Sequence, residues 1–216
     1  MKKILSLLLA LCLCCGLCLS LTSCDEVLEK LADLGGGLFD FVGEKAEGLM
    51  SGESKKIPID RDEWYDFLNT TNVEVVVQIK GEGSAHYYFA DGVVMIEQDG
   101  MAPEYMVIED GQCYYLREND DQYFAAEIDY DELTFGEMFL DGYSYDSIVY
   151  NEEYGAFCLE DPVYGMLVLG FSDGRLAEMI YVLDGNEMGG IFLYGYGEVE
   201  EIELPYYELP DDSNGN

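Results

Sequence analysis

The chain has 216 residues, of which 45 are Asp or Glu and only 10 are Lys or Arg, so its formal net charge at pH 7 is −35. So negative a field repels nucleic acid and anionic lipid head groups, and it excludes both as partners of the protein surface. Hydrophobic residues still make up 49% of the chain and aromatic residues 13%. This composition is typical of a folded chain whose excess of acid keeps its surface soluble.

The first 23 residues have the pattern of a secretory leader. Two lysines precede an apolar run from Ile4 to Leu21, and Thr-Ser then leads into Cys24. A charged segment before an apolar one is typical of export signals, and small residues before a cysteine resemble the lipobox of bacterial lipoproteins. That resemblance implies cleavage before Cys24, a diacylglyceryl group on its sulfur and acylation (for example by palmitate) of the new amine. The alternative is an uncleaved signal anchor.

Lipidation predicts where the protein resides. Two acyl chains hold a protein stably on a membrane, whereas one chain does not. We therefore expect a protein anchored to the cell membrane on its extracytoplasmic face. The rest of the chain divides into a lipidated flexible tether, a β-rich domain and a disordered tail, at residues 24–56, 57–209 and 210–216.

The domain is predicted to open with a helix. Asp60 and Glu63 stand in a capping-box relation, apolar residues follow at 64, 67 and 68, and the asparagines at 69 and 72 mark its end. Beyond this point the period changes, because Val73, Val75, Val77 and Ile79 alternate with mostly polar neighbours. Alternation of this kind indicates a half-buried strand.

Asp-Gly pairs punctuate the remaining sequence and predict tight hairpins. Asp-Gly suits type I′ turns, in which both central residues have positive φ, and tight turns join antiparallel neighbours. Acidic residues at the start of segment 129–140 and apolar ones at its end predict a second helix that crosses the sheet. The expected fold class is therefore α+β, a curved antiparallel meander (a half-barrel) packed with one or two helices. The pairs occur at 91–92, 99–100, 110–111, 141–142, 173–174 and 184–185.

The last predicted strands are apolar on both faces. In segment 176–183, positions 176, 180 and 182 on one side and 177, 179 and 181 on the other are apolar or aromatic, and segment 191–196 is similar. A sheet wetted on one face alternates instead. The cover is a helix, a partner or a bound apolar ligand, and the sequence leaves these three open. The residues predicted to line a ligand cavity are Met166, Val168, Met179, Tyr181, Ile191 and Leu193.

The whole arrangement resembles the LolA/LppX-like lipoproteins. The likeness rests on the lipobox, the tether, one early helix, a long meander with Asp-Gly hairpins, and the closing Val-Glu-Glu-Ile-Glu-Leu-Pro at 199–205. It covers residues 57–209 and implies a curved sheet around helices with an apolar cavity for lipid chains. It carries over no individual functional residue. Carriers of this family are soluble shuttles, whereas this chain is predicted to be tethered.

Two cysteines remain in the exported domain. Cys113 and Cys158 are predicted as a disulfide because an exported pair oxidises readily, with two buried free thiols as the alternative that sequence alone does not exclude.

Catalytic and metal motifs are not recognisable. His86 is the only histidine, and no motif places a nucleophile beside it. The acidic clusters at 118–121 and 129–132 lack EF-hand spacing, so loop solvation explains them better than calcium does. We therefore expect no enzyme activity, no catalytic residue, no metal and no cofactor.

The sequence thus favours a non-enzymatic lipoprotein that binds an apolar or amphipathic, lipid-like ligand. Met adapts to irregular apolar shapes, and Tyr presents a ring with a polar tip. The alternative is a cell-surface interaction module with a filled core that contacts another envelope protein. An acidic hydrolase with two unassigned carboxylates is a third, weaker hypothesis.

Overall fold

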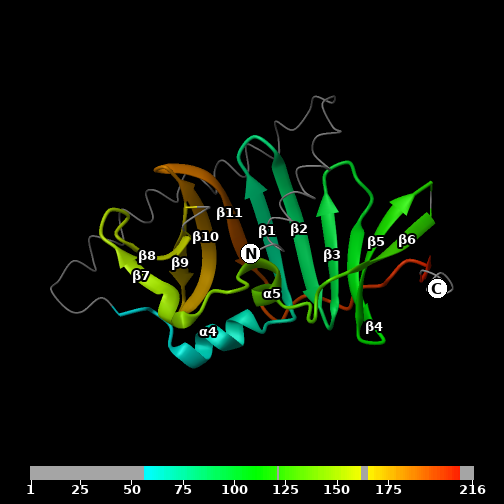
Figure 1. Cartoon of the computed structure of the whole chain (residues 1–216), viewed down its shortest axis with the longest axis horizontal. Coiled ribbons are helices and arrows are strands. Elements are labelled where there is room, and N and C mark those ends of the chain that lie inside the picture. Colours follow the sequence, from blue (N-terminus) through cyan, green and yellow to red (C-terminus); the bar gives the residue numbers. More distant parts are fainter. Residues whose placement is uncertain (1–55, 121, 162–164, 210–216) are drawn as a thin grey trace, which may run out of the picture.

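A computed structural model describes residues 56–120, 122–161 and 165–209. The predicted leader, the lipidation site Cys24, nearly all of the tether and the tail at 210–216 lie outside the described residues. The β-rich domain lies within them, and its strands form one curved sheet (Figure 1).

The sheet has twelve strands in the order β12-β6-β5-β4-β3-β2-β1-β11-β10-β9-β8-β7. Two runs of hairpin-connected strands, β1 to β6 and β7 to β11, meet where β1 pairs with β11. The strands are β1 (Val73–Ile79), β2 (Gly83–Ala90), β3 (Val93–Gln98), β4 (Glu104–Glu109), β5 (Gln112–Asn119), β6 (Gln122–Ile128), β7 (Ile148–Asn151), β8 (Ala156–Asp161), β9 (Gly165–Ser172), β10 (Arg175–Leu183), β11 (Asn186–Tyr194) and β12 (Tyr207–Glu208).

The predicted α+β class is wrong, because the described chain is mostly β. Its helices are short: α4 (Arg61–Leu68), α5 (Phe135–Phe139) and the single 3₁₀ turn η1 (Tyr145–Ser147). A simple antiparallel meander is also wrong, since β1 pairs with β11 and since β12 runs parallel to β6. The sheet is therefore mixed and contains one long-range strand pair at its centre.

Local sequence explains the elements that were predicted well. The side chain of Asp60 accepts a hydrogen bond from the Glu63 N–H, and Glu63 caps Asp60 in return, which confirms the capping box. The second helix is shorter than the predicted segment 129–140. The Thr134 side chain caps its N-terminus, so the helix begins at Phe135, and it ends at Phe139 with Leu140 as its C-cap. Four Asp-Gly pairs have positive φ at both residues, as type I′ turns require: those at 91–92, 110–111, 173–174 and 184–185.

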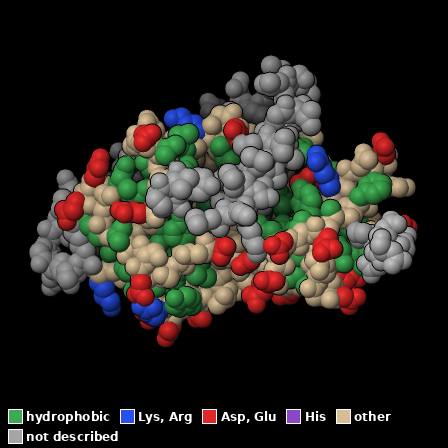
Figure 2. All heavy atoms as spheres, viewed as in Figure 1, with side chains coloured by type: hydrophobic (Ala, Val, Ile, Leu, Met, Phe, Trp, Pro, Cys, Tyr) green, Lys and Arg blue, Asp and Glu red, His purple; other side chains and the backbone are tan. Residues whose placement is uncertain are grey.

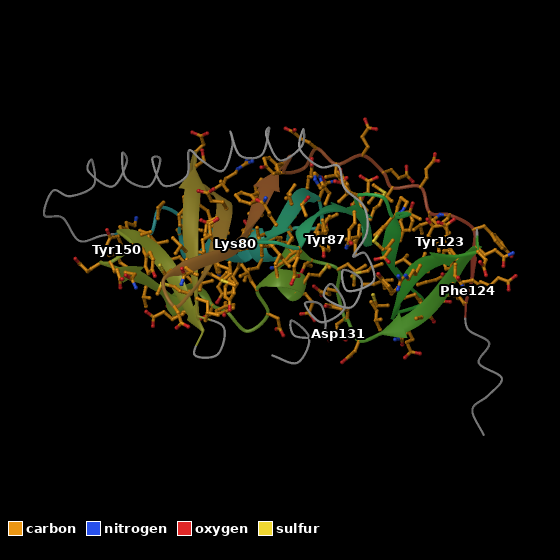
Figure 3. All side chains as sticks on the ribbon, turned by 90° about the horizontal axis from the view of Figure 1, so that it is seen from above. Lys80, Tyr87, Tyr123, Phe124, Asp131 and Tyr150 are labelled. Atoms are coloured by element: carbon orange, nitrogen blue, oxygen red, sulfur yellow. The ribbon has the colours of Figure 1, made fainter. Side chains whose placement is uncertain are left out.

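The helices pack on one face of the sheet, which we call the helix face. Val73, Val75, Tyr87 and Phe89 project from the central strands onto this side and are all buried. Their sequence neighbours point to the other side, the second face, because successive side chains of a strand alternate. Figure 3 views the sheet from above, with α5 and the red C-terminal segment on opposite sides of it.

A β-bulge in β10 changes which residues share a face. The pairing of β10 with β9 shifts register between Leu176 and Glu178. Leu176 therefore joins Met179 in the core of the helix face, whereas the sequence pattern placed it with Ile180 and Val182. An extra residue in one strand reverses the alternation beyond it, and sequence periodicity does not reveal this.

Candidate functional site

The six residues predicted to line a cavity divide between the two faces of the sheet. Met179, Ile191 and Leu193 belong to the packed core of the helix face, and Tyr181 lies on the same side opposite Leu167. The remaining two, Met166 and Val168, are cross-strand partners of Val182 and Ile180 on the second face. The six therefore do not surround one common space.

Aromatic side chains from the helices fill the centre of the helix face. Phe135 is fully buried, with its ring centroid 4.8 Å from that of Phe67 and 5.2 Å from that of Phe139. Trp64 is also fully buried, and its ring lies 5.8 Å from Phe67. The sequence left a helix, a partner or a bound ligand as possible covers of the apolar strands. On the helix face, the cover is the domain's own helices.

Two hollows open onto the surface of the described region. The larger, of about 450 Å³, is bordered by residues of β8 to β10, and of the predicted lining residues it contains only Met166. The smaller, of about 370 Å³, lies between α4 and α5 and is bordered by the carboxylates Asp131, Glu132, Glu137 and Asp141. Figure 2 shows red acidic side chains spread over this side of the molecule and few blue basic ones. No group of three or more described His, Cys, Asp or Glu residues is arranged to hold a metal ion.

The C-terminal segment covers one half of the second face. Ile202, Leu204 and Tyr207 pack against a cluster formed by Tyr105, Val107 and Leu116 on β4 and β5. Tyr123 of β6 belongs to the same cluster, whereas its neighbour Phe124 projects to the helix face and is 55% exposed (Figure 3). Residues 202–207 thus act as the lid of a second, smaller core.

One asparagine fixes the start of this segment. The side chain of Asn72 donates a hydrogen bond to the Val199 carbonyl (2.9 Å) and accepts one from the Val199 N–H (3.0 Å). The Gly197 N–H also donates to the main-chain carbonyl of Asn72 (3.0 Å). Asn72 was predicted only as the end of the first helix, but it joins that end to residues 127 positions away.

The other half of the second face carries aromatic and acidic side chains in two rows. Tyr194, Glu74 and Tyr88 are successive cross-strand partners on β11, β1 and β2. The neighbouring row runs from β10 to β3 and contains Glu178, Phe192, Val76, His86 and Glu97. We call the polar members of both rows the aromatic–acidic patch: Glu74, His86, Tyr88, Glu97, Glu178 and Tyr194.

Burial and neighbouring carboxylates make the patch electrostatically unusual. Partial burial, with the negative charges of Glu97 and Glu74, raises the pKa of Tyr88 to about 12. The pKa of Tyr194 is raised by burial and then by Glu178 and Glu74. Burial also raises the pKa of Glu178, and the charge of Glu187 adds to this effect. Each of these shifts disfavours further negative charge on the patch.

Among the described residues, His86 is the only basic side chain that approaches these carboxylates, and its neighbours in the sheet are not those of a Ser- or Cys-based triad. Its Nδ1 lies 3.8 Å from Glu74 Oε1, and its ring stacks on that of Tyr88 at 6.3 Å. A catalytic triad places a Ser or Cys next to the imidazole. The residues opposite His86 in the sheet are Val76 and Glu97 instead.

A buried carboxylate on β4 is contacted by two neighbouring side chains. Glu104 is 6% exposed, accepts a hydrogen bond from the Tyr115 hydroxyl and lies 3.3 Å from Arg117 Nε. The Arg117 contact is an ion pair without hydrogen-bond geometry, so Glu104 Oε1 has no hydrogen-bond partner. No sequence pattern indicated this trio, because a single Glu opening a strand is usually a surface residue.

The tentative disulfide is not formed, because Cys113 and Cys158 are both buried free thiols. Cys113 lies on β5 in the core of the helix face, whereas Cys158 pairs with Val168 on the second face of β8. Seven strands stand between β5 and β8 in the sheet. At about 4.8 Å per strand, neither thiol reaches the other.

Comparison with known protein families and with curated proteins finds no match for this chain. The aromatic–acidic patch was missed at the sequence level, because its members come from five strands and meet only through the β1–β11 pair. The one available signal was the mixture of Tyr and Glu at alternate positions in these strands.

Proposed function

We propose that this protein is a lipid-anchored, extracytoplasmic interaction module that acts without catalysis and contacts a partner through the open half of its second face. Cys24 is the proposed anchor, on the strength of the lipobox-like sequence before it. Among the described residues, no helix is both long enough and apolar enough to span a bilayer. The anchor therefore rests on the sequence pattern.

One observation carries the choice of an interaction module over a lipid carrier. Three of the six residues expected to contact a ligand, Met179, Ile191 and Leu193, instead pack in the core of the helix face. The second face, in contrast, presents Tyr194 with 43% of its surface exposed. Exposed tyrosines with polar surroundings are typical of contact surfaces, because the ring supplies area and the hydroxyl tolerates water.

Site-specific photocrosslinking in intact cells tests this function. Benzoylphenylalanine is placed at Ser84, which pairs with Gln78 on the second face next to the patch, or at Tyr65, an exposed residue of α4. We expect a discrete crosslinked species from position 84 and none from position 65. Equal products from both positions, or none from position 84, contradict the proposal. Native mass spectrometry that finds a stoichiometric lipid in the purified domain favours the carrier instead.

A second variant tests the anchor. Cys24→Ala is expected to appear as an unprocessed precursor or in the soluble fraction, without incorporation of labelled palmitate. Cys158→Ala serves as the matched control, since its thiol is buried and free and should not affect labelling. Normal labelling of the Cys24 variant refutes the assignment.

A further inference from the structure

We infer that the aromatic–acidic patch binds a basic polypeptide and holds one of its arginine or lysine side chains against Tyr88 and Tyr194. This inference rests on the proposed function, since it names the chemistry of the partner that the second face contacts. It follows from unbalanced charge, from the exposed ring of Tyr194 beside the half-buried ring of Tyr88, and from the dimensions of the patch.

The carboxylates of the patch have no basic residue of the described chain to neutralise them. Glu74, Glu97 and Glu178 lie on three strands of one face, and only His86 approaches one of them, at 3.8 Å from Glu74. The described arginines are engaged elsewhere: Arg61 with Asp146, Arg117 with Glu104, and Arg175 over the ring of Tyr196. The described lysines, Lys56 and Lys80, form no ion pair with the carboxylates of the patch. A cation brought by a partner relieves the mutual repulsion of these carboxylates.

The aromatic rings supply the second part of a cation site. Tyr194 is 43% exposed and lies opposite Glu74, while Tyr88 lies on the other side of Glu74. Ammonium and guanidinium groups bind to the face of such rings, and arginine also stacks on them. A carboxylate between two tyrosines therefore fits a basic side chain better than an anion or a purely apolar group.

The shape of the surface favours a polypeptide over a small amine. The patch extends from β10 to β3, across five neighbouring strands, which is a width of about 19 Å at the usual strand spacing. It lies on a sheet face and not in either of the two hollows, whose borders do not include its residues. A small amine is normally enclosed by a concave site, whereas a flat face of this width matches a chain segment.

A binding assay with matched variants tests the inference. The probe is a fluorescein-labelled (Arg-Gly)₄ peptide, and binding to the full chain is followed by fluorescence polarisation near physiological salt. Glu74→Gln combined with Glu97→Gln is expected to weaken binding about tenfold. Glu200→Gln combined with Glu201→Gln removes the same charge from two exposed positions outside the patch and is expected to change binding less than about twofold.

The rings are tested separately from the charge. Tyr194→Leu is expected to weaken binding about three- to fivefold, because it keeps apolar area but removes the ring. Tyr194→Phe keeps the ring and is expected to retain binding within about twofold. Circular dichroism of each variant verifies that the fold is intact.

Four results overturn the inference. Equal losses in the two double variants indicate non-specific attraction to an acidic protein, and equal losses in Tyr194→Leu and Tyr194→Phe exclude a role for the ring. Saturable binding of free arginine with the same dependence on the variants identifies a small amine as the ligand. If the peptide does not bind but the crosslink from position 84 persists, the basic partner is wrong and the interaction module stands.

Discussion

The two faces of the sheet are covered by different parts of the chain. On the helix face, α4 and α5 bury a continuous core that includes Trp64, Phe135 and Met138, each at most 1% exposed. On the second face, the cover that the described residues supply is the C-terminal segment, which lies over β4 and β5. Between β10 and β2 this face carries the exposed ring of Tyr194 and part-exposed carboxylates, with Val76 and Ile180 buried among them.

This difference shows which part of the molecule maintains the fold and which is available for contacts. A core of interlocked aromatic rings tolerates little change, because interiors are packed as densely as organic crystals. A face of exposed Tyr and Glu adds little to stability, because its side chains remain partly hydrated and its charges repel. Mutations on the two faces should therefore separate stability from binding.

The largest effect is expected from Phe135→Ala. Its ring is fully buried between those of Phe67 and Phe139, so truncation should lower the free energy of unfolding by about 3–5 kcal/mol. Urea denaturation followed by fluorescence measures this change. Tyr194→Ala on the second face is the control and should cost less than about 1 kcal/mol. Similar losses for both variants invalidate the contrast between the faces.

Two glycines test this contrast, because a methyl group added at each would meet a different kind of neighbour. A Cβ on Gly189 would lie 2.2 Å from the Gln78 carbonyl oxygen, which is backbone at the β1–β11 pair and does not yield. Gly189→Ala should therefore lower stability by about 1–3 kcal/mol. A Cβ on Gly170 would meet the Glu178 side chain at 2.4 Å, and this flexible chain moves aside. Gly170→Ala should cost less than about 1 kcal/mol in the same denaturation experiment, and a larger loss there contradicts the argument.

The lid of the second face depends on Asn72. Asn72→Ala removes both side-chain hydrogen bonds to Val199 and should lower stability by about 1–2 kcal/mol. Hydrogen exchange should accelerate in residues 199–208 while the central strands of the helix face stay protected. Asn119→Ala, at an exposed strand end, is the control. Uniform acceleration over the whole sheet argues against a separately fastened lid.

The smallest effect concerns alkaline pH. Burial raises the pKa of Cys113 to about 11 and that of Cys158 to about 12, from an ordinary value of 9.0. The folded state therefore favours the neutral thiols, so their contribution to stability is complete below pH 9 and is lost as the pH rises towards 11 and 12. At pH 10 the loss should be about 1 kcal/mol for each thiol.

The thiol prediction is checked through the slope of stability against pH. Cys158→Ala should flatten this slope between pH 8.5 and about 10.5, whatever its effect on stability at neutral pH. In the wild-type protein both thiols should react with a thiol reagent only after unfolding, since both are buried and free. If the slope is unchanged in the Cys158 variant, the buried-thiol argument is wrong. If the unfolded wild-type protein shows no thiols that react with the reagent, the two cysteines are not free.

Local sequence patterns specify the first helix and the hairpins of this protein. Asp60 and Glu63 specify the start of α4 because a capping box satisfies backbone groups within four residues. Asp91-Gly92 and its three equivalents specify hairpins because positive φ at both positions is a local property of these residues. The acidic composition likewise sets the strongly negative charge of the chain without reference to any fold.

How these elements combine depends instead on contacts between segments that are far apart in the sequence. The β1–β11 pair, the bulge beside Leu176 and the Asn72 contact with Val199 each join or reorient segments through contacts that no local pattern encodes. They determine that Met179 is core, that Cys113 and Cys158 stay apart, and that Tyr88 and Tyr194 share a face. Strand pairing over long sequence separations depends on how much apolar surface the whole sheet buries, which no local pattern encodes. The residues of the candidate site are therefore brought together only in the complete sheet.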